Sequence, residues 1–103
     1  MGAAVLDNGS NKREPRFRRS PRVQQAEQAG TVVLFDGARY YTLPNEVATD
    51  LWSLLAAPRS ADDMVSLLHQ QYEAPREVIA SDVSTLLKLL CRARLVTEEP
   101  TPP

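Results

Sequence analysis

Alternating apolar and polar positions in the first half of the chain predict three short strands. Residues 23–28 form a weak candidate, whereas the run 31–35 is rich in β-branched and aromatic side chains and is typical of a strand. A third strand is expected at 38–43, and Pro44 ends it because proline has no N–H to donate to a sheet. Strands so close in sequence predict an antiparallel meander.

The turn between the second and third strands decides which residues face each other. Asp36-Gly37 favours a two-residue type I′ turn, which needs positive φ at both of its central positions. With that turn, Phe35 lies opposite Ala38. The side of the meander expected to face the core then carries Val32, Leu34, Tyr41 and Leu43.

Apolar residues recur at helical spacing in three segments of the second half. Asn45 can cap the first helix, which Pro58 ends, and Ser60 can cap the second in a sequence that resembles a capping box. The third helix is expected to begin at Pro75, since a proline at a helix start loses no hydrogen bond. The order β-β-β-α-α-α predicts a winged-helix-like α+β domain, a three-stranded antiparallel meander followed by three helices. The apolar face of the third helix consists of Ile79, Val83, Leu86, Leu87 and Leu90.

Length and charge suggest where this domain begins and ends. The chain of 103 residues is long enough for one small core. Half of its 12 lysines and arginines lie in the first 22 residues, so 1–22 is expected to be a disordered basic tail that folding does not need. The folded domain is expected at 23–97, followed by a Pro-rich acidic tail at 98–103.

Side chains capable of catalysis are few and isolated. His69 and Cys91 are each the single residue of their type, without a second metal ligand or an activating partner at a suitable spacing. The sequence also lacks a glycine-rich phosphate loop, so it predicts a protein that is not an enzyme and uses no cofactor or metal. No apolar run approaches the roughly 20 residues of a membrane span. A cytoplasmic protein without membrane contact is expected, since a secretory signal is also lacking.

A binding surface is the remaining source of function. The third strand is last in the meander, so its outer edge would carry unpaired N–H and C=O groups, which are either covered or used for strand addition by a peptide. On the third helix, Val78 and Leu89 lie away from the core-facing stripe, on a flank shared with Asp82, Thr85 and Arg92. This flank either widens the contact with the core or lines a groove beside the sheet.

The order and spacing of these residues resemble the PqqD-like family of precursor-peptide recognition elements, also called RiPP recognition elements. The resemblance covers residues 23–96. The residues that carry it are Tyr40-Tyr41-Thr42-Leu43, Asn45-Glu46-Val47-Ala48, Leu51-Trp52, Leu54-Leu55, Pro58-Arg59-Ser60, Tyr72, Ala74-Pro75, Ile79, Asp82-Val83, Leu86-Leu87 and Leu90.

Members of that family fold as three strands followed by three helices and bind the leader of a ribosomally made peptide. The resemblance implies that the leader adds as a strand beside the third strand and packs against the third helix. In this way the precursor would be brought to a leader peptidase or another maturation enzyme. The leader-binding residues that the resemblance implies are Arg39, Tyr40, Tyr41, Thr42, Leu43, Val78, Asp82, Thr85, Leu89 and Arg92.

Two positions depart from the family pattern. Pro44 is inserted where family members usually run from leucine directly to asparagine, which would shorten the usable edge. Arg94 stands where a glycine usually closes the third helix, so this helix end must be satisfied differently. Neither departure removes the expected groove.

Four functions remain open at this point. The Tyr-Tyr-x-Leu strand favours the discrete recognition proteins of lasso-peptide clusters. The Ile79-x-x-Asp82-Val83 spacing would equally suit the PqqD chaperone of pyrroloquinoline quinone biosynthesis, whose partner is a radical-SAM enzyme. A small winged-helix DNA-binding protein is disfavoured because Glu77 and Asp82 place acids at the start of the third helix. A structural subunit that binds no peptide alone is the fourth possibility.

Overall fold

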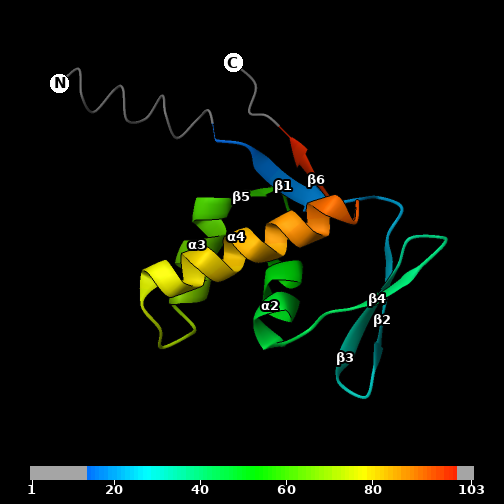
Figure 1. The fold of residues 1–103 in the computed structure, drawn as a ribbon, viewed down its shortest axis with the longest axis horizontal. Helices are drawn as coiled ribbons and strands as arrows, with labels where there is room; N and C mark the ends of the chain where they lie inside the picture. The colour runs from blue at the N-terminus through cyan, green and yellow to red at the C-terminus, as the bar shows by residue number, and fades with distance from the viewer. Residues whose placement is uncertain (1–13, 100–103) are drawn as a thin grey trace.

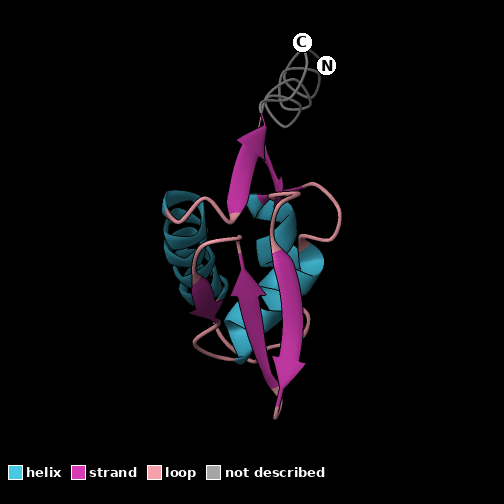
Figure 2. Cartoon of the chain, turned by 90° about the vertical axis from the view of Figure 1, so that its right-hand side faces the viewer, coloured by secondary structure: helices cyan, strands magenta, loops and turns pink. Residues whose placement is uncertain are grey.

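The computed structural model describes residues 14–99, and its first sheet is the predicted meander. The strands pair antiparallel in the order β2-β3-β4, and the sheet lies in front of the helices in Figure 2. Val32, Leu34 and Leu43 are buried, so the predicted core-facing side of the meander is confirmed. The strands are β2 (Gln24–Gln28), β3 (Thr31–Phe35) and β4 (Tyr40–Thr42).

The turn between β3 and β4 differs from the expected one. Phe35 pairs with Tyr40 and not with Ala38, and the Asp36 N–H donates to the Arg39 carbonyl at 3.2 Å. The Asp36 side chain accepts the N–H groups of Arg39 and Ala38, each at 2.8 Å, and these hydrogen bonds lower the pKa of its carboxyl. The register has moved by two residues, which is one full period of a strand, so the buried face is unchanged.

Three helices follow the meander in the predicted order, which confirms the α+β fold. The Asn45 Oδ1 accepts the Ala48 N–H at 2.9 Å, and the Ser60 Oγ accepts the Asp63 N–H at 3.1 Å, so both predicted caps are formed. The longest helix runs across the middle of Figure 1. Within residues 14–99, no helix is long and apolar enough to cross a membrane. The helices are α2 (Glu46–Leu54), α3 (Ala61–His69) and α4 (Arg76–Arg92).

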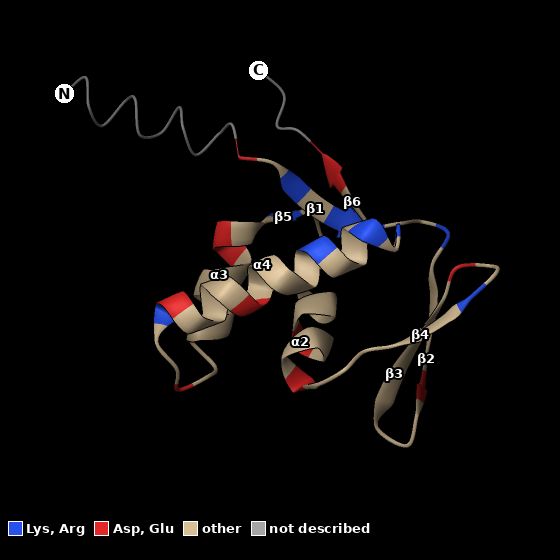
Figure 3. Ribbon diagram, in the orientation of Figure 1, with Lys and Arg blue, Asp and Glu red and all other residues tan. Residues whose placement is uncertain are grey.

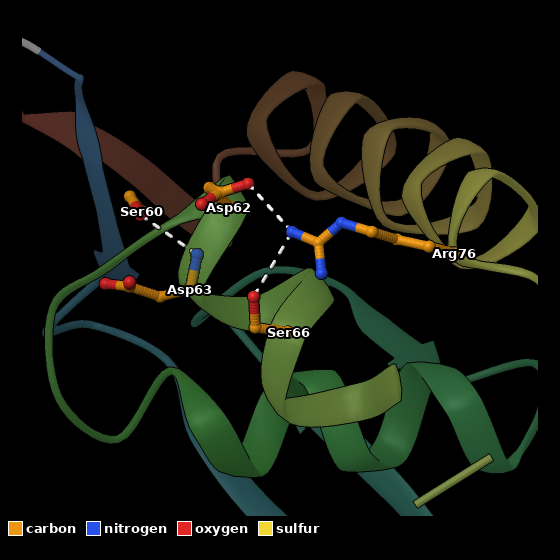
Figure 4. Close-up of polar contacts among 5 residues, drawn as sticks. All are labelled: Ser60, Asp62, Asp63, Ser66 and Arg76. Atoms are coloured by element: carbon orange, nitrogen blue, oxygen red, sulfur yellow. Dashed lines mark hydrogen bonds and ion pairs between the residues drawn. The ribbon is translucent and has the colours of Figure 1, made fainter. Parts of the chain in front are cut away.

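Polar contacts connect the helices at the surface. Arg76 pairs with Asp62 at 3.0 Å and donates to the Ser66 Oγ at 3.2 Å, which links the start of α4 to α3 (Figure 4). Both partners of this ion pair are largely exposed, so it contributes at most about 1 kcal/mol. Just after α3, the Tyr72 hydroxyl donates to the Asp50 carboxylate of α2, and this hydrogen bond raises the pKa of Tyr72 to about 12.

A second sheet, which the sequence pattern did not predict, joins the two ends of the described chain. Strand β1 (Arg16–Arg19) lies between β5 (Arg59–Ser60) and β6 (Val96–Glu99) and is antiparallel to both. The expected domain limits at residues 23 and 97 are therefore wrong, because the fold begins earlier and ends later. The outer parts of the two expected tails, 1–13 and 100–103, lie outside the described residues.

The arginines of β1 contribute to the fold. Because the strand consists mostly of these charged residues, it resembles a solvated tail in the sequence. Phe17 is its single apolar residue and packs against the core. The Arg19 Nε and Nη2 donate to the Trp52 carbonyl at 3.1 and 2.7 Å, and its guanidinium lies 4.7 Å from the centroid of the Trp52 ring. That carbonyl belongs to the last turn of α2, where the helix dipole favours a cation. Arg18 forms an ion pair with Glu99 at 3.2 Å.

The core-facing stripe of α4 is slightly rotated from the predicted one. Leu87 is 4% exposed, whereas Leu86 is only half-buried and borders a groove. The buried residues of α4 pack against a core to which the meander, α2, α3 and β6 also contribute. The largest fully buried side chains of this core are Trp52, Leu34, Leu51, Leu55, Met64, Leu68, Leu95, Val83 and Val96.

The C-terminal end of α4 has the hydrogen bonds of a Schellman motif, although an arginine occupies its glycine position. Arg94 has a φ of 63° and donates its N–H to the Cys91 carbonyl at 3.0 Å. The Leu95 N–H donates to the Leu90 carbonyl at 2.9 Å. The helix end is thus satisfied in the usual way, and the left-handed conformation costs an L-residue about 1–2 kcal/mol.

Candidate functional site

A groove of about 540 Å³ lies between the outer edge of β4 and the C-terminal half of α4. Most of its lining residues are apolar, and they come from β4 and the residues on either side of it, from the C-terminal half of α4, and from the residues just after that helix. The groove is lined by Arg39, Tyr41, Thr42, Leu43, Pro44, Leu86, Leu89, Leu90, Arg92, Ala93 and Leu95.

Main-chain hydrogen bonds fix the direction in which each residue of β4 points. The Arg39 carbonyl accepts from the Asp36 N–H, and the Leu43 N–H donates to the Val32 carbonyl, so residues 39 and 43 turn their main chain toward β3. Main-chain groups alternate in direction along an antiparallel strand. Tyr41, midway between these two, therefore also faces β3.

The outer edge of β4 presents unpaired main-chain groups. No strand within residues 14–99 lies beyond β4 in its sheet. Because direction alternates, the N–H and C=O groups of Tyr40 and Thr42 point outward and offer two donors and two acceptors to an added strand. Pro44 is the next outward position and supplies a carbonyl without an N–H. The donor edge therefore ends at Thr42, as the proline insertion suggested.

The side chains of Tyr41 and Leu43 lie in the groove, whereas that of Tyr40 does not. Tyr41 is half-buried and Leu43 is buried, and both line the groove. Tyr40 points to the opposite face, where it is 74% exposed and stacks on Phe35 with ring centroids 4.6 Å apart. Tyr40 thus contributes its main chain to the edge, while its side chain stays outside the groove.

The predicted helix residues separate into two groups. Leu89 and Arg92 line the groove, whereas Val78, Asp82 and Thr85 do not. Val78 and Leu89 are both large apolar side chains that remain about half exposed. They share one side of the helix, but 11 residues separate them, a distance of about 16 Å along the axis. The groove reaches only the C-terminal part of the predicted flank.

Five residues that the sequence did not assign to the site also line the groove: Pro44, Leu86, Leu90, Ala93 and Leu95. Leu86 and Ala93 lie three residues before and four residues after Leu89, which is the spacing of neighbours on one helix side. That spacing was the available signal for these two. Leu95 follows the helix end, so helical periodicity could not have placed it.

The lining of the groove, as far as the described residues show it, includes no His, Cys, Asp or Glu side chain. No group of three or more His, Cys, Asp or Glu side chains within residues 14–99 could hold a metal ion. Cys91 lies on another side of α4, and burial raises the pKa of its thiol, which disfavours the reactive thiolate. The groove can instead hold an extended chain, because it combines free main-chain donors with an apolar wall.

Two solved structures share this fold. One is TbiB1 in complex with the TbiA(beta) leader peptide, which is 23% identical with a TM-score of 0.68 over 77% of this chain and 93% of that chain. The other is a lasso peptide synthetase B1 complexed with the leader peptide, which is 25% identical with a TM-score of 0.69 over 79% of this chain and 96% of that chain. A search of the curated proteins gave no match.

A family model matches the part of the chain that builds both sides of the groove. This model describes coenzyme PQQ synthesis protein D (PqqD) and matches residues 30–96, more than half of the 103-residue chain. The matched span includes β3, β4 and all three helices described above. The predicted resemblance is thereby confirmed, and the chain belongs to the PqqD family.

Proposed function

We propose that this protein binds the leader of a ribosomally synthesised precursor peptide in the groove between β4 and α4. The observation that carries the proposal is that an unpaired strand edge and an exposed apolar helix side meet in one groove. An extended peptide can satisfy the edge with main-chain hydrogen bonds and bury its side chains against the helix at the same time. Both similar solved structures are complexes with leader peptides, which supports the same function here.

The leader adds to the sheet as one more strand beside β4. The outward main-chain groups of Tyr40 and Thr42 bond to the leader backbone whatever its sequence. Alternate leader side chains enter the groove and contact Tyr41, Leu43 and Leu89, which selects apolar residues. Each main-chain hydrogen bond contributes about 0.5–1.5 kcal/mol net, so burial of leader side chains supplies much of the affinity.

The protein itself is non-catalytic in this scheme. Its role is to bring the precursor peptide and a maturation enzyme together. By holding the leader, it raises the effective concentration of the precursor at an enzyme that cleaves or modifies it. We favour a partner of the lasso-peptide type, a leader peptidase, because one of the two similar structures is a lasso peptide synthetase B1.

A charge placed in the groove tests this function. Leu89→Glu should weaken binding of leader peptides at least about tenfold, or 1.4 kcal/mol, because apolar leader side chains would have to desolvate a carboxylate. The melting temperature should change little, since Leu89 is 52% exposed. Fluorescence anisotropy with labelled leaders of the short precursors encoded beside the gene measures the affinity.

Val78→Glu is the matched control, because Val78 is an equally exposed apolar residue of α4 outside the groove. It should bind leaders like the wild type. Equal losses in the two variants would show that any added charge on α4 disturbs binding. Normal binding by a folded Leu89→Glu variant would place the leader elsewhere and overturn the proposal.

The family description favours one alternative, a PqqD-type chaperone of pyrroloquinoline quinone biosynthesis. The groove would then hold the precursor of that cofactor, and the partner would be a radical-SAM enzyme. Titrating the precursor of that pathway and lasso-type leaders against the same protein separates the two candidates, because the cognate class should bind at least about tenfold more tightly, a difference of 1.4 kcal/mol.

A further inference from the structure

Two arginines supply the charge of the groove. Among the described residues that line it, Arg39 and Arg92 are the ones that are charged. Neither takes part in an ion pair within residues 14–99, where both ion pairs involve other arginines. Figure 3 shows lysines or arginines at the C-terminal end of α4 and at the turn that leads into β4.

The acid nearest to Arg39 in the sequence is already engaged. The Asp36 carboxylate accepts hydrogen bonds from the N–H groups of Ala38 and Arg39, each at 2.8 Å. These bonds lower the pKa of its carboxyl, and no ion pair within residues 14–99 joins this carboxylate to the Arg39 guanidinium. The guanidinium of Arg39 therefore remains available to a ligand.

The positive charge distinguishes this groove from the hollow on another side of α4. The whole chain has a net charge of -1, so a general attraction for anions is not expected. A second hollow, on another side of α4, has the opposite character: Glu14, Asp62 and Glu98 line it together with Lys88. A ligand with a carboxylate would thus be drawn to the β4 side and not to the other.

The order of residues along β4 gives the spacing that a ligand must have. Arg39, Tyr41 and Leu43 follow one another at intervals of two residues and turn their side chains to the same face, about 7 Å apart. An added strand has the same period. When its apolar side chains lie beside Tyr41 and Leu43, the side chain two residues further along lies beside Arg39.

We propose that the groove selects leaders in which an Asp or Glu is followed or preceded, at steps of two residues, by a pair of apolar residues. The pattern is acidic-x-apolar-x-apolar in either chain direction, and it rests on the proposed function. The leader carboxylate pairs with Arg39, and Arg92 adds attraction from the helix side. The two arginines are thus specificity-determining residues, while the edge and the apolar wall supply most of the affinity.

Selection from short random peptides displayed on phage tests this inference without a known precursor. The wild-type chain should enrich peptides with the acidic-x-apolar-x-apolar pattern. The Arg39→Gln/Arg92→Gln variant should still enrich the apolar pair but lose the preference for Asp or Glu. For one enriched peptide, each single arginine substitution should weaken binding about threefold, as expected for partly exposed ion pairs.

A charge swap provides the decisive measurement. Arg39→Glu should bind the enriched peptide more weakly, and changing the acidic residue of the peptide to lysine should restore the affinity. Peptides that bind the wild type, lose binding to Leu89→Glu and show no acidic preference would overturn this inference while the proposed function stands. If the wild-type chain enriches no peptide at all, both the proposed function and this inference fail.

Discussion

Two hollows of equal volume, about 540 Å³ each, lie on different sides of α4 and differ in what the neighbouring strand offers. The groove borders β4, whose outer edge is unpaired within the described residues. The other hollow borders β1, which is hydrogen-bonded to β5 on one side and β6 on the other. Both have apolar walls, but the groove borders an edge strand, whereas the second hollow borders β1, the central strand of its sheet, and reaches β6 at Glu98.

This difference shows that an apolar hollow is insufficient evidence for a peptide site. Apolar walls on both sides of α4 follow from the same periodicity of the helix, whereas the strand beside the wall is an edge strand at the groove and the central strand β1 at the second hollow. A peptide that lay along β1 would find both edges of that strand already paired, so its own N–H and C=O groups would stay unbonded there, which costs free energy for each group. The strand edge, more than the volume, therefore identifies the binding side.

The largest expected effect concerns the strand that closes the second hollow. Deleting residues 1–20 removes β1 from the middle of its sheet, together with the Phe17 contact and the Arg19 hydrogen bonds to Trp52. We expect a loss of about 5 kcal/mol, which is comparable to the total stability of a small domain, so the variant should be largely unfolded. Thermal melting followed by circular dichroism measures this.

The reference for that deletion is a chain that begins at residue 14 and so keeps every described strand. The comparison between the two shortened chains isolates the contribution of β1. Equal melting temperatures would mean that β1 adds nothing to the fold, and the second hollow would then lose the strand that distinguishes it from the groove.

A second prediction places the same charge on each side of α4. Leu89→Glu lies in the groove and should weaken leader binding at least about tenfold, whereas Ser84→Glu, an exposed position in the other hollow, should change it less than about twofold. Both variants should stay folded, because neither side chain is buried. Isothermal titration calorimetry with one leader peptide suffices, and a larger effect at Ser84 would reverse the comparison.

The parts of the fold with local signals were predictable from the sequence. The caps Asn45 and Ser60 and the alternation of the meander gave the correct elements. The predicted hairpin register was wrong because Asp36-Gly37 is compatible with more than one turn. The Asp36 side chain stabilises a different turn by accepting hydrogen bonds from two N–H groups. The positive-φ pair lies instead between β2 and β3, at Ala29 and Gly30.

The second sheet could not be predicted, because its strands are brought together by the rest of the fold. Residues 16–19 pair with 96–99, almost the full length of the domain away, and Arg-Phe-Arg-Arg carries no alternation.

Only part of the candidate site was predictable, because its position along α4 also depends on how the rest of the fold is arranged. Periodicity gives the angle of a residue around α4 but not which part of the helix faces β4, so Val78 was grouped with Leu89 although it lies outside the groove.

A third prediction separates the two edges of β4. Thr42→Pro removes an outward N–H and leaves the bonds to β3 in place, so leader binding should weaken about fivefold, the value of one hydrogen bond of about 1 kcal/mol. Stability should change little, since proline is tolerated where the N–H of an edge strand faces solvent. Anisotropy titration and thermal melting together test this.

Tyr41→Pro is the control for Thr42→Pro, because the main chain of Tyr41 faces β3. It should lower the melting temperature by removing a bond within the sheet. If Thr42→Pro binds leaders as tightly as the wild type while remaining folded, the outward edge is not used, and the groove differs from the second hollow only in charge.

The smallest effect is expected at the end of α4, the helix that separates the two hollows. Arg94 has a φ of 63°, which favours glycine, so Arg94→Gly should relieve strain and stabilise the fold by about 0.5–1 kcal/mol after the greater chain entropy of glycine is counted. The melting temperature should rise by about 2–6 °C, with leader binding unchanged because Arg94 does not line the groove. Arg94→Ala removes the same charge but keeps the Cβ, so it should give no such rise. Equal stabilisation by both substitutions would show that charge, and not backbone strain, limits this helix end.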